Sequence, residues 1–259
     1  MSSHAIRRVA LAACAFALCG CTGLLSEKPL FAPADYDASG ALLGHYAIMK
    51  GDTTEGVIVS RGAGGGLVFV GLKSVPGKAK DETTWVQTIY AEGAAVPLGD
   101  GDYALQISCS GLVEKGRIYA SWFGGRRSPY RQYTAYGVLA RDRKADHYWV
   151  NANFYSSNDD AQTLIFNRYG IEKGTLKNSD GTEVADTARI IPAGMPRSTA
   201  IALFRDLIAQ DMADSSEGGL LKRTNREPLL DNDEKKAVIL NDSEACRRVQ
   251  AEGEAPPDD

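Results

Sequence analysis

Long hydrophobic runs, histidine, cysteine and surplus positive charge are all scarce in this 259-residue sequence. No stretch of about 20 apolar residues occurs, so the pattern of a polytopic membrane protein is absent. The formal net charge is -4, without the basic stripe through which nucleic-acid binders meet phosphates. Hydrophobic residues still make up 44% of the chain, enough to bury a core, which excludes a wholly disordered protein.

Motifs for metal binding and catalysis are also missing. No HExxH, Cys-x-x-Cys or Asp-rich loop occurs, so we expect neither a metal site nor a cofactor. A cysteine hydrolase would use Cys109 as nucleophile and His45 or His147 as base. However, alternation with Leu105 and Ile107 points Cys109 into the core, where a thiol is inert. We therefore expect no catalytic residue, with the hydrolase as the weakest alternative.

The N-terminus has the features of an export signal. Arg7 and Arg8 precede an uncharged apolar run, Val9–Leu18, that is too short to span a bilayer. The following segment, Leu18-Cys19-Gly20-Cys21, resembles the lipobox of bacterial lipoproteins, in which an aliphatic, a variable and a small residue precede a cysteine. An ordinary cleaved secretory signal is the alternative.

The lipobox resemblance implies that residues 1–20 are a signal peptide and that the thiol of Cys21 is acylated. Several acyl chains buried in membrane lipid would anchor the protein almost permanently. The aspartate that retains relatives at the inner membrane is replaced by Thr22. The expected localisation is therefore the periplasmic side of the outer membrane, with the inner membrane as the alternative.

The remaining cysteines form a candidate pair. If Cys14 and Cys19 leave with the signal and Cys21 is acylated, only Cys109 and Cys246 are left. An even pair in an oxidising compartment favours a disulfide. Two unpaired thiols are the alternative.

Short β-rich runs separated by turn residues dominate the body of the chain. Residues 21–40, rich in Pro, Ala, Asp and Ser, predict a lipidated N-terminus and a flexible tether. A mainly β domain with its closing helix is expected over residues 41–213, with strands paired antiparallel because no helix separates the runs. Such a meander leaves two exposed edges unless it closes, so it predicts a barrel or a strongly curled sheet, with a β-sandwich as the alternative. We expect strands near Leu43–Lys50, Gly56–Ser60, Leu67–Leu72, Thr84–Ala91, Tyr103–Cys109, Arg117–Phe123, Tyr133–Arg141, Tyr148–Tyr155 and Thr163–Gly170, with a weaker one near Ile190.

An amphipathic pattern predicts a C-terminal helix that closes this domain. Ser198 can cap the helix Thr199–Met212, whose apolar stripe we expect to pack on the barrel, with a partner protein as the alternative. Residues 214–259 predict a tail with short helices at Asp231–Leu240 and Ser243–Gln250, followed by an acidic, disordered end.

Gly44-His45-Tyr46, followed by a meander and a helix, is similar to the start of lipocalin-like barrels. In that family a Gly-x-aromatic element closes the barrel base, and the aromatic residue is typically tryptophan. The resemblance implies a barrel shape.

Two groups of residues are candidates for binding. A row of aromatic and amide side chains on one strand face suits polar, ring-containing ligands if that face lines a lumen, and otherwise is a β-favouring surface. A basic cluster near the same hairpin could meet an acidic glycan or keep a sheet edge soluble. The row consists of His147, Trp149, Asn151, Asn153 and Tyr155, and the cluster of Arg126, Arg127, Arg141 and Arg143.

The glycine-rich segment Arg61–Gly66 lacks the Gly-Lys-Ser/Thr ending of a phosphate-binding loop. Because it joins two predicted strands, we expect it to be a hairpin loop.

The expected function is that of a membrane-anchored periplasmic lipoprotein acting as a structural or interaction module of the bacterial cell envelope. Its expected partners are membrane lipid, through acylated Cys21, and an envelope protein, with no nucleic acid. A carrier of a small apolar or glycan-like ligand in a barrel cup is the first alternative, and a cysteine hydrolase is the second.

Overall fold

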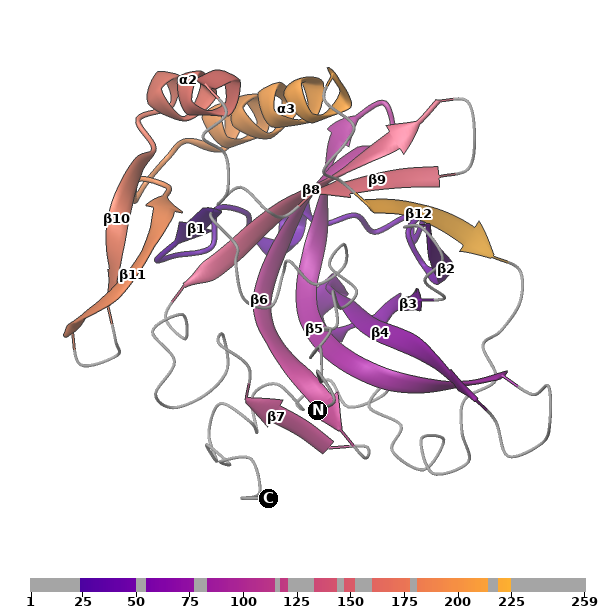
Figure 1. Cartoon of the computed structure of the whole chain (residues 1–259). Coiled ribbons are helices and arrows are strands. Elements are labelled where there is room, and N and C mark those ends of the chain that lie inside the picture. Colours follow the sequence, from indigo (N-terminus) through magenta and orange to yellow (C-terminus); the bar gives the residue numbers. More distant parts are fainter. Residues whose placement is uncertain are drawn as a thin grey trace, which may run out of the picture.

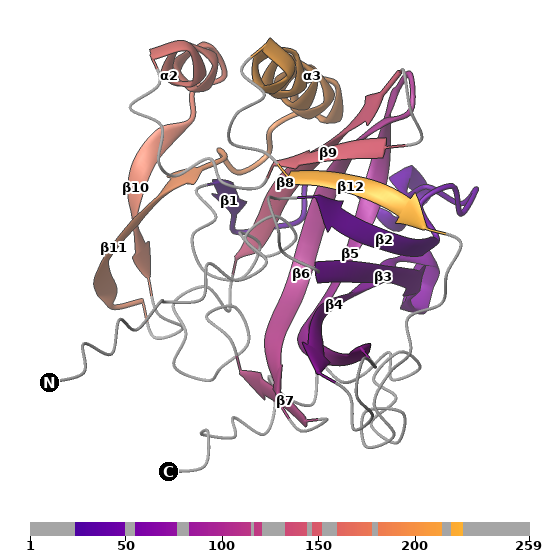
Figure 2. The same cartoon turned by 45° about the vertical axis from the view of Figure 1, so that its right-hand side comes forward.

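The computed structural model describes residues 24–49, 55–76, 83–114, 117–120, 133–143, 147–151, 160–177, 181–213 and 219–224. Eight antiparallel strands form a closed barrel, shown in two views in Figures 1 and 2. In spatial order these are β8 (Thr134–Asp142), β9 (His147–Asn151), β12 (Gly219–Thr224), β2 (Gly44–Met49), β3 (Glu55–Arg61), β4 (Leu67–Pro76), β5 (Thr83–Gly99) and β6 (Asp102–Glu114).

Additional elements extend the barrel on one side. A short strand, β1, pairs antiparallel with β8 and parallel with β11, which forms a hairpin with β10. Two helices lie side by side above these added strands (Figure 1). Their bounds, with those of the remaining short elements, are β1 (Leu24–Ser26), η2 (Pro33–Asp35), η3 (Ala63–Gly65), β7 (Arg117–Ala120), α2 (Asp160–Arg168), β10 (Glu172–Lys177), β11 (Glu183–Ile190) and α3 (Arg197–Ala213).

Barrel closure depends on two pairings. At one seam Leu105 of β6 lies opposite Gly137 of β8. At the other, β12 inserts between β9 and β2, where Leu221 lies opposite both Ile48 and Tyr148. The antiparallel barrel expected from the sequence is thereby confirmed, and the sandwich alternative is wrong.

The described part of the barrel interior is filled with side chains. Tyr103, Leu105 and Ile107 point inward, as their alternation predicts, and belong to one buried cluster. The ring of Tyr148 lies 6.3 Å from that of Tyr46 and 6.4 Å from that of Tyr103. Close packing of this kind contributes both apolar burial and aromatic contacts to stability.

Helix α3 covers part of the outer face of the barrel. Leu203, Phe204 and Leu207 are fully buried, and the Phe204 ring lies 5.9 Å from Phe31 and 5.7 Å from Tyr136. Packing on the barrel wall therefore buries the apolar stripe. Neither this helix nor any other described one is long and apolar enough to cross a membrane.

The helix predicted at the C-terminal end of the domain does not end it. α3 is followed by β12, which returns to complete the barrel. A single short strand such as Gly219–Thr224 carries little periodicity, so the sequence pattern did not reveal it. The short helices expected at Asp231–Leu240 and Ser243–Gln250 lie outside the described residues.

The strand predicted at Thr163–Gly170 is wrong, because this segment belongs to helix α2. Gln162, Ile165 and Phe166 are its buried residues, at the spacing of three and four that a helix requires. Ile165 and Phe166 are adjacent and both buried, whereas successive side chains of a strand point to opposite faces.

Residues 24–40 are not the flexible tether that their composition predicts. Leu24 and Leu25 are fully buried in β1. Further along, Gln106 on β6 accepts a hydrogen bond from the Phe31 amide at 3.1 Å and donates to the Phe31 carbonyl at 3.2 Å and the Tyr36 hydroxyl at 3.2 Å. We call residues 30–37 the strap, since these contacts hold it against the barrel.

Replacement of Gln106 tests the importance of this anchor. Gln106 is 4% exposed, and Gln106→Ala would leave the amide and carbonyl of Phe31 without their partners. We expect a loss of about 2–4 kcal/mol in the free energy of unfolding, measured by urea denaturation. Ser108→Ala on the same strand removes an exposed hydroxyl and should cost less than about 1 kcal/mol. Equal losses in the two variants would contradict this role of Gln106.

Candidate functional site

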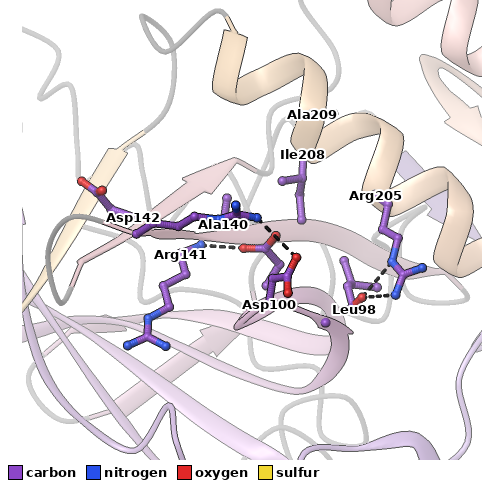
Figure 3. Close-up of a pocket in the computed structure, with 11 residues that line it drawn as sticks. Leu98, Asp100, Ala140, Arg141, Asp142, Arg205, Ile208 and Ala209 are labelled. Atoms are coloured by element: carbon purple, nitrogen blue, oxygen red, sulfur yellow. Dashed lines mark hydrogen bonds and ion pairs between the residues drawn. The ribbon is translucent and has the colours of Figure 1, made fainter.

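A cleft of about 570 Å³ opens where the β5–β6 hairpin, the end of β8 and helix α3 meet (Figure 3). Its walls combine apolar side chains with charges of both signs. The apolar lining residues are Leu98, Ala140, Ile208 and Ala209, and the charged ones are Asp100, Asp102, Asp142, Arg141, Arg143 and Arg205.

A tight turn places the two central aspartates of the cleft. Gly99, Asp100 and Gly101 all have positive φ angles, of 101°, 55° and 85°. A Cβ atom at Gly101 would lie 2.7 Å from the Arg141 side chain, and the φ of 85° is strained for residues with a Cβ, so glycine is favoured there. Asp102 then accepts a hydrogen bond from the Arg141 backbone amide at 2.8 Å, which ties the hairpin to β8.

Arg205 links the helix to the hairpin. Its Nε donates to the Leu98 carbonyl at 2.7 Å, and its Nη2 donates to the same oxygen. Figure 3 shows this side chain reaching down from α3, while the side chain of Arg141 extends away from Asp100. The carbonyl does not neutralise the Arg205 guanidinium, so positive charge remains at the mouth of the cleft.

The carboxylates of the cleft have different environments. Asp100 forms an ion pair with Arg143 at 3.3 Å, but both side chains are more than three-quarters exposed, so water weakens the attraction. Burial raises the pKa of Asp102 above its ordinary value, although the Arg141 amide and the Arg143 charge oppose that shift. Mixed charges around an apolar floor suit the binding of a polypeptide segment. Among the residues described, no group of three His, Cys, Asp or Glu side chains could hold a metal ion.

The described members of the aromatic and amide row predicted from the sequence lie on the outer face of the barrel. Tyr148 and Val150 are the inward residues of β9, so His147, Trp149 and Asn151 between them point outward. Trp149 packs against the apolar cluster beneath α3. Asn153 and Tyr155 lie outside the described residues. The row was expected to bind a ligand only if it lined the barrel lumen. Its described members point outward, so they do not meet this condition.

Cys109 is buried in an apolar cluster, as expected, but this cluster lies on the outer face of the barrel and not inside it with Leu105 and Ile107. A register shift lets Ile107 pair with Gly93 and Cys109 with Glu92, so Ser108 is the extra residue of a bulge. Alternation restarts there, and Cys109 is buried on the outer face instead. It is disulfide-bonded, so its sulfur is not a nucleophile.

The two histidines do not meet Cys109. His45 on β2 is separated from Cys109 on β6 by β3, β4 and β5. His147 on β9 lies opposite Asp142 at one end of β8, whereas Cys109 lies beyond Ile107, which pairs with Ala135 toward the other end of that strand. The structure thus brings together no Cys-His pair from these residues.

Two of the four arginines in the predicted basic cluster belong to the described residues. Arg141 and Arg143 line the cleft, and Arg126 and Arg127 lie outside the described residues. No local sequence pattern indicates the role of Arg205, because the Arg205–Leu98 contact joins segments 107 positions apart. The turn Gly99-Asp100-Gly101 was the only local signal for this site.

The segment Arg61–Gly66 joins β3 and β4, as expected for a hairpin loop. Three of its glycines, Gly62, Gly64 and Gly66, line a smaller pocket of about 290 Å³, together with Tyr36, Glu92 and Gln106. Gln106 and Tyr36 hydrogen-bond each other there, so these polar groups are engaged in holding the strap.

Comparison with known proteins identifies no relative. No protein-family model matches the sequence, and neither a curated protein nor a solved structure does. The residues themselves are therefore the basis for assigning a function.

Neutralising Asp102 tests the electrostatics of the cleft. A carboxyl whose pKa is raised on folding binds its proton more tightly in the folded state, so its stabilising contribution is present in acid and lost as the pH rises through the folded pKa. We expect Asp102→Asn, which removes a partly buried charge, to be more stable than the parent at pH 7. The difference should shrink below about pH 4, in urea denaturation followed across pH.

Asp100→Asn is the matched control, because it removes an exposed carboxylate from the same turn. It should change stability by no more than about 0.5 kcal/mol at either pH. A lower stability of Asp102→Asn than of the parent at pH 7 would contradict the dominance of desolvation.

Proposed function

We propose that this chain is a membrane-anchored lipoprotein of the bacterial cell envelope, lying on the periplasmic side of the outer membrane and acting as a structural or interaction module. The lipobox-like segment Leu18-Cys19-Gly20-Cys21 is the observation that carries the proposal. A basic n-region and a short apolar run stand before it, as export requires. Acylation of Cys21 would supply the anchor.

The position of β1 determines how such an anchor would hold the domain. Leu24, the first residue of β1, is fully buried, and only Thr22 and Gly23 separate it from Cys21. Three peptide units span at most about 11 Å, so the acyl chains would enter the bilayer close to the folded body. A lipid anchor here would therefore keep the barrel beside the membrane, without a long tether.

The cleft is the proposed contact surface for an envelope partner. β1 pairs with β8 at Ala135, whereas the cleft takes Arg141 from the far part of that strand. Six strand residues separate the two positions by about 20 Å. The cleft thus lies away from the attachment point, and its aspartates disfavour polyphosphate ligands such as nucleic acids.

A carrier with its ligand inside a barrel cup has less support. Tyr46 of the lipocalin-like Gly44-x-Tyr46 element does point into the barrel, where the Arg223 guanidinium lies over its ring at 5.5 Å. However, the described inward side chains pack against one another in a single buried cluster. A ligand would have to displace them.

Substitution of Cys21 tests the anchor. We expect the mature protein to begin at Cys21, to carry the mass of fatty acyl groups, and to sediment with outer membranes. In Cys21→Ser the acyl mass and the membrane association should both be lost, since the hydroxyl does not replace the thiol as acceptor. Cys19→Ser is the control and should retain both. A parent protein recovered without acyl mass from the aqueous periplasmic fraction would contradict the proposal.

Crosslinking in cells tests the contact surface. A photo-crosslinking residue in place of Ala209, which is exposed at the cleft, should give a defined adduct with one envelope protein. The same residue in place of Thr175, exposed on β10, should not. Adducts of equal yield at both positions, or none at position 209, would count against the cleft as the contact surface.

A further inference from the structure

Apolar residues form a patch on the outer face of the barrel, on strands β3, β4, β5 and β6. Ile58, Val70 and Tyr90 are examples, and they point outward because their strand neighbours Val59 and Phe69 belong to the interior cluster. The outer patch consists of Ile58, Val68, Val70, Leu72, Tyr90 and Cys109, which are between 0% and 7% exposed. Burial this complete is unexpected for the outside of a barrel wall and requires a cover.

The described helices do not supply that cover. α3 packs on β8 and β5, and α2 packs on α3. Their buried residues belong to a different apolar cluster, and every member of the outer patch comes from the four strands themselves. Within the part of the chain that the structure describes, no helix therefore lies across the patch.

Cys109 provides a covalent attachment point within the outer patch. It lies within the outer patch and is disulfide-bonded, and the other four cysteines all lie outside the described residues. If the chain is a lipoprotein as proposed above, Cys14 and Cys19 are removed with the signal and the Cys21 thiol is acylated. Only Cys246 then remains as the partner.

We propose that the C-terminal segment, residues 225–246, covers the outer patch and is fastened there by a disulfide between Cys109 and Cys246. The chain leaves β12 at Thr224, 22 positions before Cys246, a length that reaches across a small barrel when extended. The segment carries Leu229, Leu230 and the run Ala237-Val238-Ile239-Leu240, which supply apolar side chains for the patch. The acidic end beyond Glu252 is not part of the cover.

Bond formation follows ordinary thiol–disulfide exchange. The Cys109 and Cys246 thiols lose two protons, and their two electrons reduce the disulfide of an envelope oxidant to a dithiol. The closed loop restricts the unfolded chain and keeps the covering segment close to the patch.

Disulfide mapping of the mature protein, by mass spectrometry of an unreduced digest, tests the pairing. We expect a Cys109–Cys246 linked peptide together with an acylated Cys21. A free Cys109 beside an acylated Cys21 would overturn this inference alone. A Cys109–Cys246 bond in a chain with unacylated Cys21 would leave it standing and overturn the lipoprotein proposal, whereas a Cys109–Cys21 bond would overturn both.

Truncation tests the cover itself. Trp85 packs against the outer patch, so a chain with Trp122→Phe and Trp149→Phe reports on this site through its emission. Ending that chain after Thr224 should shift the Trp85 emission to longer wavelength and raise the binding of a hydrophobic dye several-fold. Ending it after Ala251 removes only the acidic end and should change neither. Unchanged Trp85 emission in the chain that ends after Thr224 would contradict the proposal.

Crosslinking within the intact chain keeps the proposal testable if the long truncation fails to fold. A photo-crosslinking residue in place of Trp85 should form an intramolecular bond to a peptide within residues 225–246. A crosslink to a second copy of the chain, or to another segment, would identify a different cover and overturn the assignment.

Discussion

Insertion of β12 between β9 and β2 is the constraint on which the rest of this structure depends. Without it, two neighbouring strands would present unpaired backbone groups, and the curled sheet would have open edges. With it, Leu221 joins the interior cluster, and Arg223 lies over Tyr46 at the start of β2. The closed wall then has a filled inside, so the surfaces left for recognition are on its outside and at its ends.

The outer face is divided among different covers. The strap is held by the side chain of Gln106, which is satisfied on both its amide atoms. α3 lies over a second region and fixes the β5–β6 hairpin through Arg205, and in doing so it forms one wall of the charged cleft. The outer patch forms a third region, around a disulfide-bonded cysteine. Gln106, Arg205 and Cys109 are therefore three points at which other segments are fastened to the outside of the barrel.

Much of the barrel could be predicted from the sequence, because strand alternation is a local property. Residues such as Tyr103, Leu105 and Ile107 lie where their period places them. Prediction failed where one extra residue or one distant contact decides the outcome. The bulge at Ser108 reverses the direction of Cys109, and the cleft unites a turn, a strand end and a helix that no local pattern connects. The proposed anchor signal lies outside the described residues, so its interpretation depends on the sequence alone.

Barrel closure would also set an order of events during the export proposed above. Tyr46 and Arg223 are 177 positions apart, yet they meet across neighbouring strands. A polypeptide that crosses the inner membrane from its N-terminus delivers β2 early and β12 near the end of transit. The barrel cannot close until almost the whole chain has been delivered. Strand pairing over such a sequence separation is intrinsically slow. Until β12 pairs, the edges of β9 and β2 stay open, which exposes them to pairing with other chains.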